Sequence, residues 1–484
     1  MDLDIQNDQL RRLLEEASAI AARHYRVAED ARIFPDKTVS ELRARFDEPL
    51  PLEPVDAARL LEIVESDILS TATLSGSPNY YAFISSCGNP FGFLGEVLSA
   101  AINQPVMREN VFPSATAIER QVIRWIAEFI GYSTDAGGLL VSGGSVANLI
   151  GLAVARKLKS PFDVASEGVK AGPTMTIYVS TEGHHSLDKA VDVLGFGKKH
   201  MRKIPVKPDC TIDLAALEFE ISKDRAAGFH PFCVIANGGT VNTGAVDPLD
   251  ALADLCAAHD LWLHVDGAYG VPAAATRIVG DLFRGLERAD SVTLDPHKWL
   301  HVPYEASCVL IKDRHHLRDT FEFDAAAAYA KSDTDDPEQL DFIDHGLQMT
   351  RSFKALKIWM TFKGYGAERL KLAIEESIIT MRHLVDLIDR SDDFEMIAPS
   401  PLSSVCFRYR PADVGDDESY IEELNRRLIA AIEKDGRVYL RGTRLHGRTS
   451  LRACSVIYRT RPRHVEYLLE VLREIGSSLH SLKE

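Results

Sequence analysis

The sequence predicts an α/β fold built around a mostly parallel β-sheet. From about residue 138 to residue 311, short apolar runs alternate with polar turns and helical stretches, which is the order of βαβ units. Two runs end in reactive side chains: LWLHV leads into Asp266, and SVTL leads into the turn DPHK, which ends at Lys298. Because parallel strands direct their carboxyl ends to one edge of a sheet, we expect Asp266 and Lys298 to face one crevice.

The N-terminal part predicts a layer with little core of its own. Apolar residues at helical spacing predict an amphipathic helix over residues 7–25. Residues 32–54 hold four prolines and predict an extended arm. We expect residues 1–85 to form this layer, residues 86–372 a large domain and residues 373–484 a small C-terminal domain.

The large domain opens with two predicted helices and a glycine turn. Residues 90–131 predict helices on either side of the loop NQPVMRENVFPS. The stretch GLLVSGGSVAN, residues 138–148, then predicts a strand, a turn and a helix that runs to about residue 157. Free N–H groups at a helix start favour an anion, so we expect Gly144 and Ser145 to bind one, with Asn148 near by.

Two further strands end in candidate site residues. The run MTIYVS, residues 175–180, leads to the adjacent histidines His184 and His185. Adjacent side chains point apart and no third ligand stands at matching spacing, so we predict no metal site. Residues 231–236 predict the next strand, followed by a glycine-rich turn that contains Thr240 and by Asp247 as a helix N-cap.

The C-terminal third predicts a smaller unit. A long helix is expected after Lys354, with a change of composition near residues 364–373. The segments FRYR, VYLRGTRLHG and TSLRACSV predict strands between helices at residues 419–434 and 463–478.

Composition excludes several classes of function. A net charge of −16 argues against a nucleic-acid partner. The seven cysteines lack the spacing of a zinc site or a disulfide framework. No run approaches the about 20 apolar residues of a membrane span, and the acidic N-terminus does not resemble a signal peptide. We therefore expect a cytoplasmic protein without a membrane partner.

An amine and a carboxylate in one crevice suit pyridoxal phosphate. The lysine amine bonds the cofactor, and the carboxylate keeps the pyridine nitrogen protonated so that the ring can accept electrons. Alone, Lys298 would more often belong to a simple turn and Asp266 to a helix cap. The ordered set of a Gly-Gly-Ser turn, a histidine pair, an Asp after a strand and PHKW favours the cofactor.

On the motifs PHKW and HVDGAYG, the chain resembles the pyridoxal-phosphate-dependent group II amino acid decarboxylases, the family of aromatic L-amino acid, glutamate and histidine decarboxylases. The resemblance runs from about Pro78 to the last helix. It implies the fold of PLP-dependent transferases (fold type I), pyridoxal phosphate as cofactor, an amino acid as substrate and a homodimer whose N-terminal layer wraps the partner.

The resemblance also implies roles for individual residues. His184 matches the histidine that stacks on the cofactor ring, Thr240 lies beside the cofactor, and His297 is a candidate phosphate or positioning contact. The candidates for the substrate pocket are Phe83, Ile84, Ser85, Ser86 and Met107. The apolar members of this set indicate an aromatic or apolar substrate, whereas Arg108 and Glu109 could address a polar one, so the substrate stays open.

One position on the family's mobile loop leaves two products possible, an amine or an aldehyde. In relatives, a tyrosine on this loop protonates the carbanion, and counting back from Arg351 puts Phe342 at that position. One hypothesis is a decarboxylase in which His184, Lys298 or Tyr329 supplies the proton. The second is an aldehyde synthase, in which oxygen intercepts the carbanion. An inactive cofactor-binding scaffold is the third, and the complete set of Asp266, His184 and Lys298 argues against it.

Overall fold

A seven-stranded sheet organises the larger part of the molecule. The computed structural model describes residues 4–26, 29–322 and 339–481. The strand order is β1-β7-β6-β5-β4-β2-β3; the pairs from β6 to β3 are parallel, and β7 is antiparallel to both its neighbours. The strands are β1 (Gly137–Val141), β2 (Met175–Ser180), β3 (Met201–Ile204), β4 (His230–Asn237), β5 (Trp262–Asp266), β6 (Ser291–Leu294) and β7 (Ser307–Ile311). The predicted α/β fold with a mostly parallel sheet is confirmed.

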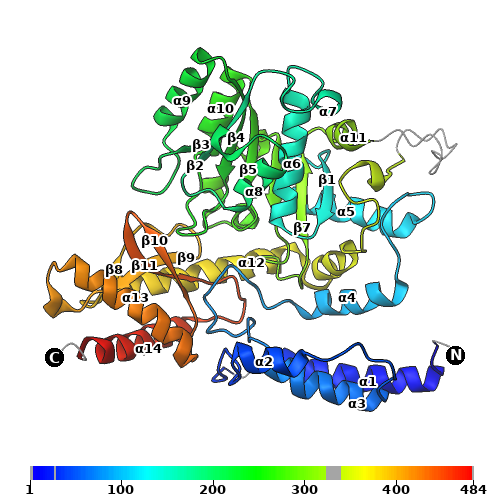
Figure 1. Ribbon diagram of the computed structural model, residues 1–484, viewed down its shortest axis with the longest axis vertical. Coiled ribbons are helices and arrows are strands. Elements are labelled where there is room, and N and C mark those ends of the chain that lie inside the picture. The colour runs from blue at the N-terminus through cyan, green and yellow to red at the C-terminus, as the bar shows by residue number, and fades with distance from the viewer. Residues whose placement is uncertain (1–3, 27–28, 323–338, 482–484) are drawn as a thin grey trace.

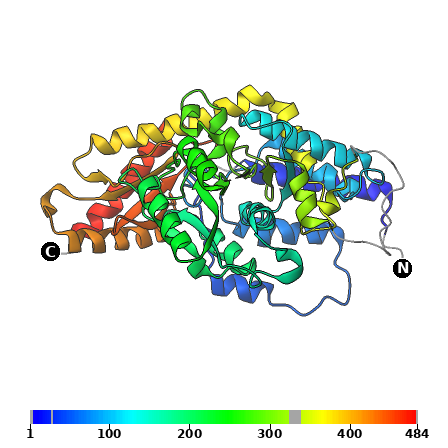
Figure 2. The same cartoon turned by 90° about the horizontal axis from the view of Figure 1, so that it is seen from above.

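Helices enclose this sheet (Figure 1, Figure 2). All residues of β2, β5, β6 and β7 are buried, which requires cover on both faces. α6 packs across β1 and β4 to β7, whereas α5 contacts β1 and β7 and α10 contacts β4 and β5. The helices of this part are α4 (Pro90–Ile102), α5 (Pro113–Phe129), α6 (Gly144–Lys159), α7 (Val164–Glu167), α8 (Ser186–Val193), α9 (Leu214–Ala226), α10 (Leu249–His259) and α11 (His315–Phe321).

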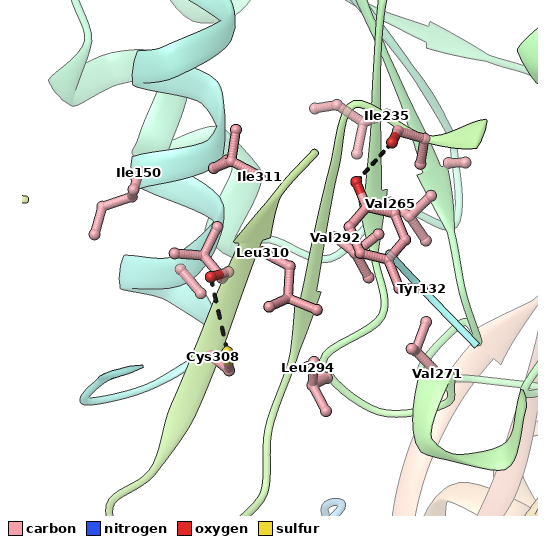
Figure 3. Packing of buried hydrophobic residues seen from close by; sticks show 14 of the residues in the cluster. Tyr132, Ile150, Ile235, Val265, Val271, Val292, Leu294, Cys308, Leu310 and Ile311 are labelled. Carbon is pink, nitrogen blue, oxygen red and sulfur yellow. Dashed lines mark hydrogen bonds between the residues drawn. The ribbon is translucent and has the colours of Figure 1, made fainter. Parts of the chain in front are cut away.

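Apolar side chains of neighbouring strands fill the core of this part. Figure 3 shows Ile235, Val265, Val292 and Leu310 together in the interior, each from a different strand. All four are fully buried. The β-branched residues that made these runs recognisable in the sequence therefore form the packing that holds the strands in register.

The N-terminal layer is more helical than expected. α1 (Asn7–Tyr25) matches the predicted helix, and Figure 1 shows it beside α3 (Ala57–Ile63) along one side of the molecule. The predicted extended arm is wrong in part, because α2 (Val39–Phe46) lies inside it. Thr38 and Glu41 form a capping box that begins this helix between the prolines.

A second sheet, of order β10-β11-β9-β8, forms the core of the C-terminal part. Its elements are β8 (Phe394–Met396), β9 (Ser404–Tyr409), α13 (Glu418–Asp435), β10 (Arg441–Leu445), β11 (Arg448–Cys454) and α14 (Pro462–Ser481). The long helix α12 (Ala355–Asp389) contacts α4 and α5 as well as β8 and β9, and Gly366, at φ 73°, interrupts it. The predicted strands and helices are present, with β8 in addition, and the predicted domain boundaries stay a prediction.

The predicted role of Asp247 as a helix N-cap is wrong. Asp247 does not cap α10, whose N-cap is Pro248; its carboxylate accepts hydrogen bonds from the backbone N–H groups of Ile212 and Asn237 instead. Among the described residues, no helix combines the length and the hydropathy that a membrane span requires.

A buried ion pair ties the first sheet to the helices beside it. Arg351 NH1 lies 2.5 Å from Glu119 Oε1, and both side chains are almost fully buried. Glu119 also accepts from Leu140 N on β1, while Arg351 donates to Leu140 O. The pair therefore joins α5, β1 and the segment that precedes α12.

We expect Arg351→Met to lower the free energy of unfolding by about 3–5 kcal/mol, because it leaves the Glu119 carboxylate buried without its cation. Urea unfolding followed by circular dichroism measures the change. The matched control is Arg426→Met, which removes an exposed partner of Glu423 and should change the free energy by less than about 1 kcal/mol. A cost for Arg351→Met no larger than that of the control would contradict a structural role for the pair.

Candidate active site

The carboxyl ends of five strands meet at one cavity of about 350 Å³. The turns after β1, β2, β4, β5 and β6 all contribute to its wall. The predicted site residues that line it are Phe83, Ile84, Gly144, Ser145, Asn148, His184, Thr240, Asp266, His297 and Lys298. The expectation that Asp266 and Lys298 face one crevice is confirmed by this arrangement.

Asp266 ends β5 and is held by two donors. Asn148 Nδ2 donates to Asp266 Oδ2 over 2.9 Å, and the backbone N–H of Ala268 donates to Oδ1 over 3.3 Å. Asn148, which the sequence suggested near an anion, therefore points to the carboxylate, because α6 lies across β5 and turns this side chain inward. Asp266 is thereby left as an oriented acceptor at the cavity wall.

Lys298 is paired with a carboxylate of its own turn. Its Nζ lies 3.0 Å from Asp295 Oδ2, and Asp295 is buried. Burial alone would lower the pKa of Lys298, but the carboxylates of Asp295 and Asp266 outweigh it and raise the pKa. The amine is thus a cation at rest, with Asp295 as the nearest group able to take its proton.

The two adjacent histidines have separate environments. His184 Nδ1 accepts from the backbone N–H of Ser186 over 3.2 Å, which leaves its proton on Nε2. Burial lowers the pKa of His184 despite the opposing charge of Asp266, so the ring is neutral near pH 7. The side chain of His185 is 99% exposed and belongs to the surface.

The start of α6 offers a close approach for an anion. A methyl group added at Gly144 would lie 2.9 Å from Ala268 Cβ and 3.1 Å from Asp295 Oδ2, so only glycine fits this first turn. Ser145 follows it on the cavity wall. His297 Nδ1 accepts from the backbone N–H of Ala306 over 3.1 Å, which leaves its proton on Nε2, 3.5 Å from Asp295 Oδ2. Burial lowers the pKa of His297, so this ring too is neutral.

Tyr269, in the turn after β5, lines the cavity and contacts the C-terminal part. Its hydroxyl lies 2.7 Å from Ser403 Oγ and accepts from Ser403 N over 3.0 Å, while its ring stacks on Trp299 with 5.0 Å between centroids. A methyl group at Gly270 would lie 2.2 Å from Gly238 O and 2.8 Å from Leu402 Cδ1. The two glycines therefore let the C-terminal part pack directly on the turns that carry Thr240 and Asp266.

Four predicted site residues do not line this cavity: Ser85, Ser86, Met107 and Phe342. Ser86 Oγ lies 2.8 Å from His301 Nδ1 in the interior instead. Ser85 is partly buried elsewhere, and Met107 O accepts from Phe342 N over 2.8 Å. Phe342 is 1% exposed, its ring lies 4.8 Å from the Arg351 guanidinium carbon, and it lines a different cavity. The assignment of Phe342 to a mobile loop over the Lys298 cavity is therefore not supported by its position. Tyr329, the alternative proton donor, lies outside the described residues.

Three charged residues of the cavity were missed in the sequence. They are Asp295, Glu182 and Arg452. Asp295 could have been found, since it stands three positions before Lys298 in one turn. Arg452 could not, because β11 belongs to the other sheet and nothing in its sequence indicates which strand end reaches the cavity.

The residues present fit pyridoxal phosphate. Lys298 supplies the amine, Asp266 an oriented carboxylate for the pyridine nitrogen, His184 a flat neutral ring, and the start of α6 the donors for a phosphate. Among the described residues, no three histidine, cysteine or acidic side chains are grouped to hold a metal ion.

Comparisons with known proteins agree with this chemistry. A family model described as the pyridoxal-dependent decarboxylase conserved domain matches residues 40–410. The aromatic-L-amino-acid decarboxylase of Bacillus atrophaeus is 35% identical over 442 residues, covering 90% of this chain and 88% of that protein. The phenylacetaldehyde synthase of Arabidopsis thaliana is 28% identical over 482 residues, covering 98% and 97%.

A solved structure extends the similarity to the whole fold. The crystal structure of Oryza sativa TDC with PLP and tryptamine has a TM-score of 0.92 and 26% identity, and the match covers 99% of this chain and 100% of that chain. Fold type I and pyridoxal phosphate, both implied by the PHKW and HVDGAYG motifs, are thereby confirmed. The chain belongs to the pyridoxal-dependent decarboxylase family and is a PLP-dependent carboxy-lyase.

Proposed function

We propose that this enzyme decarboxylates an aromatic L-amino acid to the corresponding amine. The observation that carries the proposal is the single cavity in which Lys298, Asp266 and His184 meet beside the apolar side chains of Phe83 and Ile84. Two relatives support the substrate class. They are the Bacillus atrophaeus aromatic-L-amino-acid decarboxylase and the tryptophan decarboxylase TDC1 of Camptotheca acuminata, which is 31% identical over 435 residues.

Pyridoxal phosphate, when bound, delocalises the electron pair that remains on Cα after carbon dioxide leaves. Asp266 would hold its negative charge toward the pyridine nitrogen, and the donors Asn148 and Ala268 N hold its two oxygens in place. The buried side chains of Ile84 and Tyr269 line the same cavity, and an apolar wall strengthens the electrostatic effect of Asp266.

Protons are handled by groups already in place. Asp295 Oδ2 can accept the proton that Lys298 must lose before its amine acts as a nucleophile. His184 lines the cavity with its proton on Nε2 and can donate a hydrogen bond to a substrate carboxylate. Arg452, 6% exposed and with its Nε unpaired among the described residues, is the cavity's candidate contact for a carboxylate.

The direct test is release of carbon dioxide from single amino acids by the purified holoenzyme. We expect L-tyrosine, L-tryptophan or L-phenylalanine to be turned over at least about ten-fold faster than L-glutamate, because Phe83 and Ile84 offer an apolar wall and a buried carboxylate costs free energy there. Faster turnover of L-glutamate would reject the aromatic substrate and retain the decarboxylase.

We expect Lys298→Ala to lower turnover by at least about a thousand-fold and to abolish the visible absorbance of lysine-bound cofactor, as follows from deleting a covalent catalytic group. Absorbance spectra and carbon dioxide release measure the two effects. Lys354→Ala is the matched control, since Lys354 pairs with Glu305 and does not line the cavity, and its spectrum should be unchanged. Survival of the visible band in Lys298→Ala would contradict the assignment.

The aldehyde synthase remains the second candidate, favoured by the Arabidopsis thaliana relative named above. Its argument from the residues was Phe342 in place of a loop tyrosine. That argument loses support, because the Phe342 ring lies against Arg351 and lines a different cavity. We therefore give the amine product priority.

We expect turnover to produce the amine with far less than one equivalent of hydrogen peroxide, in the native enzyme and in Phe342→Tyr alike. The added hydroxyl should change the melting temperature little, because Phe342 lines a cavity whose wall includes the polar side chains of Glu109, Arg318 and His345. A coupled peroxide assay and thermal melts measure both. One equivalent of peroxide in the native enzyme, lost in Phe342→Tyr, would restore the aldehyde synthase.

We also propose that the enzyme is a homodimer joined through α4. Apolar side chains on this helix are between 40% and 54% exposed, more than isolated surface residues explain: Phe93, Leu94, Val97, Leu98 and Ile102. The N-terminal layer adds exposed Leu10, Leu14 and Leu60. Met107 lies in the loop after α4, so an interface there would also involve this predicted pocket residue.

We expect the native enzyme to have the mass of a dimer in light scattering, and the double variant Leu94→Asp/Leu98→Asp to have the mass of a monomer, because burying two carboxylates in an apolar interface is prohibitive. Phe219→Asp is the matched control: Phe219 is 69% exposed on α9, and its variant should remain dimeric. A native monomer, or an unchanged mass in the double variant, would reject the interface.

A further inference from the structure

We propose that His264 is a positioning residue that acts through Asn148 to hold the Asp266 carboxylate for the cofactor's pyridine nitrogen; the inference rests on the proposed function. His264 lies on β5, two positions before Asp266, and is fully buried. It does not line the cavity, and the mechanism above makes no use of it.

The hydrogen bonds leave one arrangement of protons. Asn148 Nδ2 donates to Asp266, so Asn148 Oδ1 is the atom 3.0 Å from His264 Nε2 and must accept there. His264 therefore carries its proton on Nε2. At the other side of the ring, Nδ1 lies 2.7 Å from Ser291 Oγ and has to accept from that hydroxyl.

The chain of donors begins at a group that can only donate. Trp262 Nε1 donates to Ser291 Oγ over 2.8 Å, which directs the serine proton toward His264. Thr293 Oγ1 adds a second donor to Asn148 Oδ1 over 2.9 Å. Every bond from Trp262 through Ser291, His264 and Asn148 thus points in the same direction, toward the carboxylate.

A glycine of α6 lies against the His264 ring. A methyl group added at Gly151 of α6 would lie 2.7 Å from His264 Cε1 and 2.8 Å from Nδ1. The helix that carries Asn148 therefore approaches His264 as closely as a bare backbone permits. Burial lowers the pKa of His264 to about 4, so the ring stays neutral and keeps Nδ1 as an acceptor near pH 7.

Two conservative variants separate the ends of the ring. In His264→Gln the side-chain amide can reach Asn148 as Nε2 does, whereas in His264→Asn the shorter amide can reach Ser291 but not Asn148. Loss of a hydrogen bond that orients a charged group corresponds to about a ten-fold change in affinity. The Asp266 contact should weaken in His264→Asn and persist in His264→Gln.

The experiment compares two ligands on cofactor-free enzyme by fluorescence titration: pyridoxal phosphate, and its deaza analogue in which carbon replaces the pyridine nitrogen. Both share the aldehyde and the phosphate, so the ratio of their dissociation constants reports the nitrogen contact alone. We expect the preference for pyridoxal phosphate to fall about ten-fold in His264→Asn and to stay near the native value in His264→Gln.

Tyr178→Phe is the matched control, since it removes the buried hydrogen bond of 2.7 Å from Tyr178 on β2 to Asp224 on α9, and neither residue lines the cavity. Its melting temperature should fall with the ligand preference unchanged. A native preference in His264→Asn would overturn the inference and leave the proposed function intact. A native enzyme that does not discriminate the two ligands would contradict the Asp266 contact itself, and with it the proposed function.

Discussion

The parallel direction of β4, β5 and β6 is the constraint on which the site depends. Because these strands run the same way, the polar residues that follow them lie at the same edge of the sheet. Thr240, Asp266 and Lys298 are thus brought to one cavity wall although up to 58 residues separate them in the chain. The antiparallel strand β7 does not break this arrangement, because it follows Lys298 and carries the chain away from the site.

Buried charge has to be compensated at that edge, and the structure does so in two different ways. Lys298 has an ionic partner in Asp295, whereas Asp266 is held by neutral donors from Asn148 and the backbone. Neutral donors leave the negative charge of Asp266 available to a ligand cation. The ion pair keeps Lys298 protonated, so its amine becomes a nucleophile only after the proton is removed. The division suits a site that must bind a charged ring and also release an amine.

Much of the fold could be predicted because each apolar run ended in a polar turn. The strands before His184 and Asp266 were found on this pattern, as was the helix α1 from its apolar spacing. Local sequence could not place Phe342, because its burial depends on the guanidinium of Arg351, which is itself held by Glu119 from far upstream. Two short elements were not predicted, the charged strand β3 and the capped helix α2. Each has too few residues for a clear hydrophobic pattern, and α2 lies within the proline-rich arm.

The contact between Tyr269 and Ser403 bears on how this family can vary. Tyr269 touches the C-terminal part through its hydroxyl and the lysine-bearing turn through its stack on Trp299. A chimera with the C-terminal third of a relative would therefore have different contacts below the turn that carries Lys298. The contacts that such an exchange would have to preserve are those of Leu402 with Gly270 and of Ser403 with Tyr269.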